Sequence, residues 1–470
     1  MNKYSPSRRT FFKGFAGISA AAAALTPRLG LANPSEGPKR GAGARYMGGY
    51  AAPKLDKVRA VIIGTGSRGS KQADRFSKLE GVEIVGLCDV YEDLATKTKQ
   101  RILRKGGNEK HPDIKLYHGS KNAWKRMLEE VKPNTVLIAT PWEDHAEMAI
   151  ASMEAGAHTF VELPLATTIK DLWRVIDCSE RTQKHCMMME NVNYGREELM
   201  FLNMVRQGVI GELVHGESAY IHELRKQMRN VDRGTGFWRT LHYAKRNGNL
   251  YPPHGLGPIS QYMNLARGDD NYGSIVSMSS QALGRAKYAK ENFPADHKWN
   301  QLEYKCGDIN TSIIKTYVGR TIMIQWDETS PRPYTRHNLI QGTEGTLAGF
   351  PTRVALEMKY PGAPKNYHQW AEDEKLAYIY ETYDHPLYKR TQELAKSMGG
   401  HGGMDAIKLI RMAECLLNGE PLDQNVYESA FWSSVGPLSE ASVAQGGMPQ
   451  QFPDFTRGNW KNTDPLAIVS

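Results

Sequence analysis

The chain has 470 residues, of which 40% are hydrophobic and 24% are charged, an ordinary composition for a globular protein of two domains. Its formal net charge is +9, but the first 32 residues hold five basic residues and no acid, which leaves +4 for the remainder. This small excess excludes a broad basic surface for nucleic acid or an anionic membrane. The five cysteines form no CxxC motif and no histidine–cysteine group has zinc spacing, so we expect buried thiols and no metal.

The first residues, 1–32, are predicted to be a twin-arginine (Tat) signal peptide. Arg8 and Arg9 precede Thr-Phe-Phe-Lys, a short Ala-rich apolar core follows at 15–25, and small residues end at Ala32 in a pattern suited to cleavage. The core is too short to span a bilayer, so we expect no stable membrane insertion. The Tat translocase carries folded proteins, which suits a protein that binds a nucleotide before export. We therefore expect a periplasmic or secreted protein.

Residues 33–54 are rich in glycine, proline and basic residues, and are expected to form a linker or an arm lying on a neighbouring surface. The chain is then organised around residues 58–89. An apolar run at 58–63 predicts a buried strand, and the glycine-rich loop of residues 64–69 follows it directly. A helical pattern over 70–79 leads to a second strand at 82–88, which ends on Asp89.

This order is the βαβ dinucleotide fingerprint in its proper context. The glycines permit a tight turn and let the backbone approach a pyrophosphate at a helix N-terminus. Asp89 follows Gly64 by 25 residues, where a carboxylate accepts a hydrogen bond from a ribose 2′-hydroxyl. The carboxylate favours NAD over NADP, because a 2′-phosphate would face its charge, although Arg68 offers a charge that would offset this preference.

Helical and strand patterns continue to alternate through residues 55–192, the predicted nucleotide domain. We expect helices over 92–106, 122–131, 143–155 and 169–183, and strands over 135–139, 158–161 and 186–189. The alternation predicts a doubly wound parallel sheet, the Rossmann architecture of the α/β class. Ligands bind such sheets beyond the carboxyl ends of the strands. The residues placed there are Trp142, His145, Glu162, Asn191 and Tyr194.

Residues 193–470 are predicted to form a second domain with an open, mostly antiparallel sheet. Strands are expected near 211–220, 274–278, 311–317, 321–326, 338–341 and 354–358, and residues 232–249 are expected to be polar and irregular. Tyr251 and His254 lie three apart at the start of a predicted helix. A helical stretch over 387–419 is interrupted by four glycines around His401. This interruption indicates either a helix–helix turn or a close approach to a ligand.

The runs AVIIGTGSRG, LCDV, IATPWEDH, VELP and MMMENVNY resemble the superfamily of glucose–fructose oxidoreductase and inositol dehydrogenase (Gfo/Idh/MocA). The resemblance implies a Rossmann domain joined to an α+β domain whose open sheet forms the substrate cleft. That sheet often forms an oligomer interface, so a homo-oligomer is among the expected assemblies. The superfamily usually carries Glu-Lys-Pro where this chain has Glu162-Leu163-Pro164. Leu163 cannot handle a substrate proton, which counts against a simple dehydrogenase.

The runs WRT, NGNLYPPHGLGP, SPRPY, IQGTEG and GGHGGMD resemble glycoside hydrolase family 109, the NAD-dependent α-N-acetylgalactosaminidases. By this resemblance, the catalytic residues are Tyr251, His254 and His401. NAD is held by Gly64, Gly66, Ser67, Arg68, Gly69, Asp89, Trp142, Glu143, Asp144, His145, Glu162, Leu163 and Asn191. The sugar contacts Tyr194, Tyr220, Arg239, Tyr251, Pro252, Pro253, His254, Tyr334 and His401.

The resemblance implies a glycosidase that acts on a terminal amino-sugar glycoside. The expected chemistry is C3 oxidation, C1–C2 elimination of the aglycone, addition of water and re-reduction, with either Tyr251 or His254 as the base. Two alternatives stay open. One is a periplasmic NAD(P)-dependent sugar oxidoreductase that releases an oxidised product, and the other is a non-catalytic sugar sensor with structural NAD.

Overall fold

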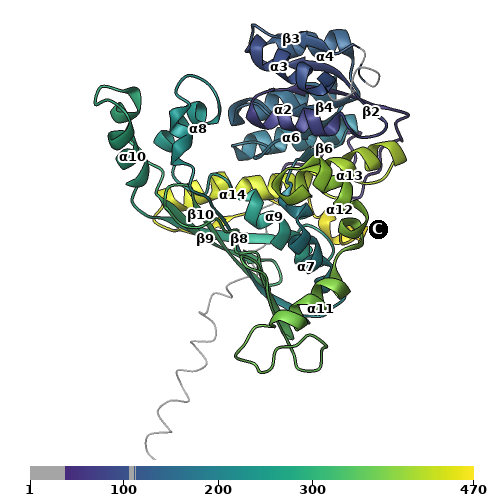
Figure 1. The fold of residues 1–470 in the computed structure, drawn as a ribbon, viewed down its shortest axis with the longest axis vertical. Coiled ribbons are helices and arrows are strands. Elements are labelled where there is room, and N and C mark those ends of the chain that lie inside the picture. Colours follow the sequence, from purple (N-terminus) through teal and green to yellow (C-terminus); the bar gives the residue numbers. More distant parts are fainter. Residues whose placement is uncertain (1–36, 105–110, 112, 470) are drawn as a thin grey trace, which may run out of the picture.

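The computed structural model describes residues 37–104, 111 and 113–469, so the predicted signal peptide lies outside the described residues. The chain forms two domains (Figure 1), with a parallel sheet in the first and an open mixed sheet in the second. The expected fold class is therefore confirmed. Among the described residues, no helix has the length and apolar character needed to cross a membrane.

The Rossmann domain is built on six parallel strands in the order β3-β2-β1-β4-β5-β6. The central strand β1 pairs with β2 on one side and β4 on the other, and its apolar side chains are buried. The strands are β1 Val58–Ile63, β2 Val82–Cys88, β3 Lys115–Tyr117, β4 Thr135–Ile138, β5 His158–Val161 and β6 Cys186–Met188. The helices are α2 Ser67–Phe76, α3 Glu92–Ile102, α4 Ala123–Val131, α5 His145–Glu154 and α6 Ile169–Thr182.

The second sheet has eight strands in the order β13-β12-β11-β7-β10-β9-β8-β14. Its pairings are antiparallel except that of β7 with β10. The strands are β7 Leu213–Ile221, β8 Tyr272–Ser279, β9 Ile309–Thr316, β10 Thr321–Asp327, β11 Leu339–Gly342, β12 Gly345–Ala348, β13 Arg353–Leu356 and β14 Gln450–Gln451. The helices that follow the Rossmann domain are α7 Arg196–Arg206, α8 Thr235–Lys245, α9 Pro253–Tyr262, α10 Gly284–Asn292, α11 Asp373–Tyr383, α12 Pro386–Met398, α13 Met404–Asn418 and α14 Val426–Ala444.

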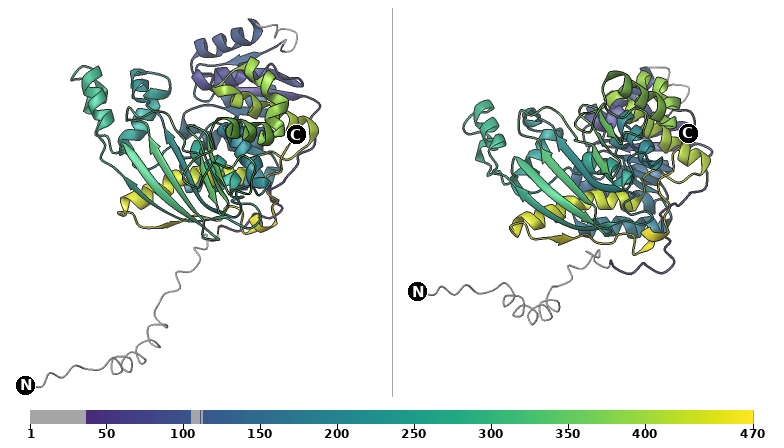
Figure 2. Two further views of the ribbon diagram at one scale, coloured as in Figure 1. Left: turned by 60° about the horizontal axis from the view of Figure 1, so that its bottom comes forward. Right: turned by 90° about the horizontal axis from the view of Figure 1, so that it is seen from below.

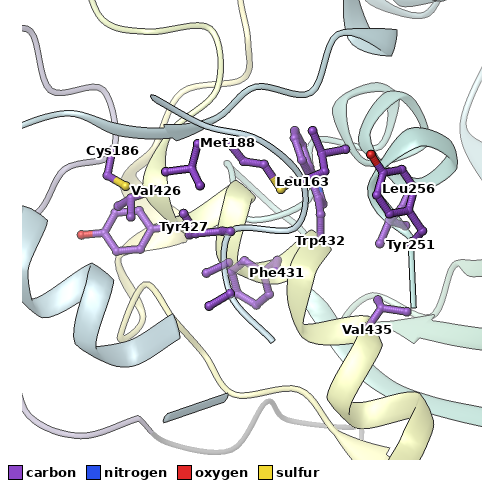
Figure 3. Packing of buried hydrophobic residues seen from close by; sticks show 14 of the residues in the cluster. Leu163, Cys186, Met188, Tyr251, Leu256, Val426, Tyr427, Phe431, Trp432 and Val435 are labelled. Atoms are coloured by element: carbon purple, nitrogen blue, oxygen red, sulfur yellow. The ribbon is translucent and has the colours of Figure 1, made fainter. Parts of the chain in front are cut away.

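Two late helices join the domains. Helix α14 packs against α6 and β6 of the Rossmann domain and against β8 and α9 of the second domain, and Figure 2 shows it running along one face of the second sheet. Its apolar side chains, among them Phe431 and Trp432, fill the core between the domains (Figure 3). Helix α13 packs against α2 and β1. The glycine-rich loop of the Rossmann domain therefore faces a segment from the far end of the chain.

The segment 37–54 is an arm that lies on its own chain. Tyr46 stacks on Tyr427 with ring centroids 4.8 Å apart, and the Met47 amide donates to the Tyr427 hydroxyl at 3.0 Å. Arg40 forms an ion pair with the buried Glu180 at 3.0 Å. These contacts fasten the arm to α6 and α14.

Several elements differ from the sequence prediction. Residues 232–249, expected to be irregular, contain helix α8 from Thr235 to Lys245. The pattern was misleading because most polar residues of this helix are only partly exposed and Trp238 faces the site described below. No clear hydrophobic periodicity in the sequence marks the short edge strand β3, the strand β12 or the helices α10, α11 and α14.

Candidate active site

The glycine-rich loop leaves the N-terminus of α2 open to a ligand. Gly66 is the N-cap, no side chain caps the helix, and a Cβ atom at Gly66 would meet nothing within 4 Å. Gly69 is required for a different reason, since a Cβ there would lie 1.8 Å from the Gly64 carbonyl oxygen. Exposed amide groups at the start of a helix bind phosphate through hydrogen bonds and the helix dipole.

The ends of the next strands supply further groups that suit a dinucleotide. Asp89 ends β2, and its carboxylate is held by the amides of Thr65 at 2.7 Å and Tyr91 at 3.0 Å. Asn191 follows β6, and its buried side-chain oxygen has no partner in the described structure. The Rossmann residues therefore fit NAD, with the α2 N-terminus for the pyrophosphate and Asp89 for the ribose.

Arg68 is held by two carboxylates. Its Nε donates to Glu162 at 2.8 Å, and its Nη2 lies 2.8 Å from the carboxylate of Asp405 at the start of α13. Burial alone would raise the pKa of Glu162, but the charges of Arg68 and Lys408 outweigh burial and lower it. Because both carboxylates engage the Arg68 guanidinium, Arg68 does not offset the charge of Asp89, and the preference for NAD stands.

Three residues expected to contact ligands have other tasks. His145 is fully buried, and its ring nitrogens contact the carbonyls of Pro164 at 2.7 Å and Thr140 at 3.0 Å, so the imidazole braces the ends of β4 and β5. Leu163 packs in the core beside Trp432 (Figure 3). Tyr194 is buried, and its hydroxyl donates to Asp423 at 3.1 Å.

The catalytic candidates form a cluster of rings where the two domains meet. Tyr251 lies with its ring centroid 5.0 Å from Tyr220, 5.1 Å from His254 and 6.0 Å from Trp142. Trp142 follows β4 of the Rossmann domain, whereas Tyr220 belongs to β7 and His254 to α9. We call the set Trp142, Tyr220, Tyr251 and His254 the aromatic cluster. It combines the carboxyl end of the parallel sheet with the inner face of the second domain.

A buried carboxylate orients His254. Nδ1 of His254 lies 2.8 Å and 3.0 Å from the two oxygens of Glu190, whose side chain is fully buried after β6. Gly257 permits this approach, because a Cβ there would lie 2.7 Å from the Asn193 side chain and 3.2 Å from that of Glu190. A carboxylate on Nδ1 fixes the proton on that nitrogen and leaves Nε2 as an acceptor.

Tyr251 has the opposite character. Burial raises the pKa of Tyr251, while the charge of Arg239 opposes the shift. The phenol therefore stays protonated at neutral pH and is suited to donate a proton. The Tyr220 hydroxyl lies 2.9 Å from Nδ1 of His222, and burial lowers the pKa of His222, so this neighbouring imidazole is neutral.

Arg239 covers the other side of the cluster. Its guanidinium lies 4.8 Å from the Tyr251 ring centroid and 5.0 Å from that of Trp142, and its Nη1 is 3.7 Å from the fully buried Glu328. The Arg239 Nε has no partner in the described structure. Tyr334, which is 40% exposed, lies at the rim, with its ring centroid 6.3 Å from that of Tyr220.

His401 enters the same region from the loop between α12 and α13. Its φ is 48°, and the glycines on both sides also have positive φ, so the loop is a sharp turn between helices. Nδ1 of His401 lies 2.7 Å from Asp405, which also binds Arg68. The loop therefore turns the chain between two helices and leaves the His401 imidazole exposed beside Asp405.

The remaining predicted residues flank this arrangement. Glu143 accepts from His242 of α8 at 3.2 Å, which links the Rossmann domain to the second domain, and Pro252 and Pro253 begin α9. Burial raises the pKa of Asp144. Within the described ranges, no group of three or more histidine, cysteine, aspartate or glutamate side chains is arranged to hold a metal ion.

Sequence reasoning missed the carboxylates and the lysine that support the site. Glu190, Glu328, Asp405 and Lys408 are all fully or almost fully buried. The only signal available was the position of Glu190 at a predicted strand end, one residue before Asn191. The others become recognisable only when distant helices and strands pack together.

Comparison with known proteins places these features in context. Residues 58–190 match the family described as "Oxidoreductase family, NAD-binding Rossmann fold". A levoglucosan dehydrogenase in complex with NADH and levoglucosan has the same fold, with a TM-score of 0.64, 15% identity, and coverage of 85% of this chain and 100% of that chain. Residues 58–190 thus form an NAD-binding Rossmann domain of the Gfo/Idh/MocA type, and NAD is the cofactor.

Residues 194–462 match the model "Glycosyl hydrolase 109, C-terminal domain". "Glycosyl hydrolase family 109 protein 1" of Akkermansia muciniphila is 64% identical over 433 residues, covering 92% of this chain and 89% of that protein. A protein of the same name from Shewanella sp. strain MR-4 is 52% identical over 462 residues, with 98% of each covered. The chain belongs to glycosyl hydrolase family 109.

Proposed function

We propose that this family 109 protein hydrolyses terminal α-linked N-acetylgalactosamine through a redox-assisted elimination. The observation that carries the proposal is the pairing of Tyr251 with the His254–Glu190 dyad beside the NAD-binding strand ends. The pair offers an acid and a base within one site, which suits elimination and readdition across C1 and C2.

The surrounding carboxylates support this choice over direct displacement. Retaining and inverting glycosidases generally use two carboxyl groups across the scissile bond. Here Glu162 and Asp405 bind Arg68, Glu190 binds His254, and Glu328 accepts from Tyr243. Each of these four carboxylates near the aromatic cluster is therefore already engaged.

The chemistry that NAD supplies when bound is reversible hydride transfer at C3 of the sugar. A carbonyl at C3 makes the C2–H acidic, and Nε2 of His254 takes that proton while Glu190 stabilises the imidazolium. Tyr251 donates its phenolic proton to the departing glycosidic oxygen. Water then adds across the C1–C2 double bond, with the same two groups acting in reverse. Arg239 is placed to bind a sugar or acetamido oxygen with its free Nε.

The test is turnover of p-nitrophenyl α-N-acetylgalactosaminide by holoenzyme purified with its NAD. We expect release of the phenol without net accumulation of NADH, and loss of release in His254→Ala. The β-anomer and the α-galactoside serve as matched controls for the linkage and the acetamido group. Steady accumulation of NADH with an oxidised sugar would support a sugar oxidoreductase. Sugar binding without any reaction would support a sensor.

We also propose that the chain reaches the periplasm or the exterior by the twin-arginine route. The support is the Arg8-Arg9 pair with the apolar core behind it. The need to fold around NAD before export is consistent with this route.

A further inference from the structure

Lys408 is a buried lysine that the chemistry above does not use. It lies on α13, one turn after Asp405, and its side chain is fully buried. Within the described residues it is the only lysine in that class. Its Nζ reaches the Met189 carbonyl at 3.4 Å, a long contact for a group with three donors. An ammonium held so far from water is costly unless opposite charges surround it.

Three carboxylates from different elements act on its charge. Glu162 comes from the end of β5, Glu190 from the end of β6 and Asp405 from its own helix, and all three attract the Lys408 charge, while Arg68 on α2 opposes it. Among the described residues, the ion pairs of Arg68 are with Glu162 and Asp405 and not with Glu190. Lys408 is therefore a second cation, beside Arg68, for this group of carboxylates.

The backbone links Lys408 to the same carboxylate. The Met189 carbonyl that accepts from Lys408 immediately precedes Glu190. The Glu190 carbonyl accepts from Gln424 at 2.9 Å, and its side chain accepts from the Val192 amide at 2.8 Å. Lys408 thus touches the segment that carries the partner of His254 and supplies charge to it.

We propose that Lys408 is a positioning residue for the proposed reaction, a buried ammonium that contacts the segment carrying Glu190, the partner of His254, and supplies positive charge to the site in which His254 acts as the base. This assignment rests on the proposed function for its kinetic consequence. In this proposal Lys408 acts through the His254–Glu190 dyad and makes no contact with the substrate.

Electrostatics agree with the geometry. Burial lowers the pKa of Lys408 to about 8, with Glu162 the largest opposing influence, so the side chain is still mainly protonated at neutral pH. Removing its charge makes the surroundings of His254 more negative. A more negative field strengthens proton binding by an imidazole. In a variant without the Lys408 charge, the His254 base should therefore be inactivated by protonation at a higher pH than in the wild type.

The experiment compares holoenzymes with Lys408→Gln, Lys408→Met and Lys408→Arg. Glutamine keeps a donor for the Met189 carbonyl but lacks the charge, methionine lacks both, and arginine keeps the charge. We expect the acid limb of the kcat profile to move up by about one pH unit in the glutamine and methionine variants and to remain in place in the arginine variant. NAD content and KM should stay near wild-type values. Lys396→Met on the exposed face of α12 is the matched control and should change nothing.

A second readout does not need turnover. ¹⁵N NMR of histidine-labelled holoenzyme, with His254→Ala to assign the signal, follows protonation of His254 directly, and its midpoint should move in the same direction. If Lys408→Gln folds and retains NAD but neither the kinetic limb nor the His254 signal moves, the proposal is overturned. If the wild type releases no phenol, the proposed function fails by itself, and the NMR comparison still decides the role of Lys408.

Discussion

Replacement of Glu190 by glutamine removes the negative charge from the His254–Glu190 dyad. The Oε1 atom of Glu190 accepts from the Val192 amide at 2.8 Å and lies 2.8 Å from Nδ1 of His254. A glutamine oxygen at that position keeps both contacts, while the amide nitrogen takes the place of Oε2, which lies 3.0 Å from Nδ1, so the variant removes the charge together with the second acceptor. A hydrogen bond to a charged group contributes about 1.5–3 kcal/mol. Since the imidazolium forms as C2 is deprotonated, kcat should fall roughly 10- to 150-fold.

The assay is phenol release by holoenzyme, with NAD content measured on the same sample. KM and NAD content should remain near the wild-type values, because Glu190 touches neither ligand in this account. Glu180→Gln is a matched control: Glu180 is also fully buried and binds Arg40 and Arg457, but it fastens the N-terminal arm. That variant should lose stability and keep kcat. Unchanged kcat in Glu190→Gln would refute the dyad, and equal losses in both variants would show a general effect of burial.

Four further changes have defined outcomes. Tyr251→Phe should reduce kcat by about 10²-fold or more with NAD retained, and a near-normal rate would exclude Tyr251 as the acid. Asp89→Ala should lose its NAD during dialysis, under conditions in which the wild type keeps about one NAD per chain. A wild-type protein that carries no NAD and is still fully active without added NAD would contradict this. Burial lowers the pKa of His385 to about 4. Between about pH 6.5 and pH 4 the unfolded chain therefore binds a proton at His385 that the folded chain does not bind, and the free energy of unfolding falls as the pH is lowered through this range. His385→Asn keeps an acceptor for the N-cap of α12, and in urea titrations it should recover roughly 3 kcal/mol of the loss at pH 4. Replacing Arg8 and Arg9 by lysine should retain precursor in the cytoplasm, and normal periplasmic yield by fractionation would exclude twin-arginine export.

The Rossmann domain was accessible from sequence because its signals are local. Strands 82–88 and 158–161 have the predicted bounds, since each is an apolar run with turn residues at its ends. The buried helix α14 was not predicted, because small and apolar residues occupy almost all of its sides and no amphipathic stripe marks it. Helix α8 was missed because its aromatic residues serve the site and so disturb the periodic pattern.

The candidate site was predictable only in part for a related reason. Tyr251 and His254 stand in a distinctive local motif, and the structure brings them together with Tyr220 and Arg239. Their supporting charges depend on tertiary packing across long sequence separations, as with Glu190, which lies 64 positions from His254. His145 also follows a strand end, and in the structure its ring nitrogens contact the backbone carbonyls of Pro164 and Thr140, a placement that the sequence pattern does not reveal.

The central claim is that the glycosidic bond breaks by elimination after transient oxidation, with His254 taking the C2 proton. The most direct measurement is hydrolysis in deuterated water by the NAD-loaded enzyme, followed by mass spectrometry and NMR of the released sugar. The account predicts deuterium at C2 of the product, because the proton on the His254 nitrogen exchanges with solvent before it returns. The C3 hydrogen should be retained, because the hydride is returned from the same cofactor. Hydrolysis that leaves the C2 hydrogen unexchanged, or equal rates with and without NAD, would contradict the account.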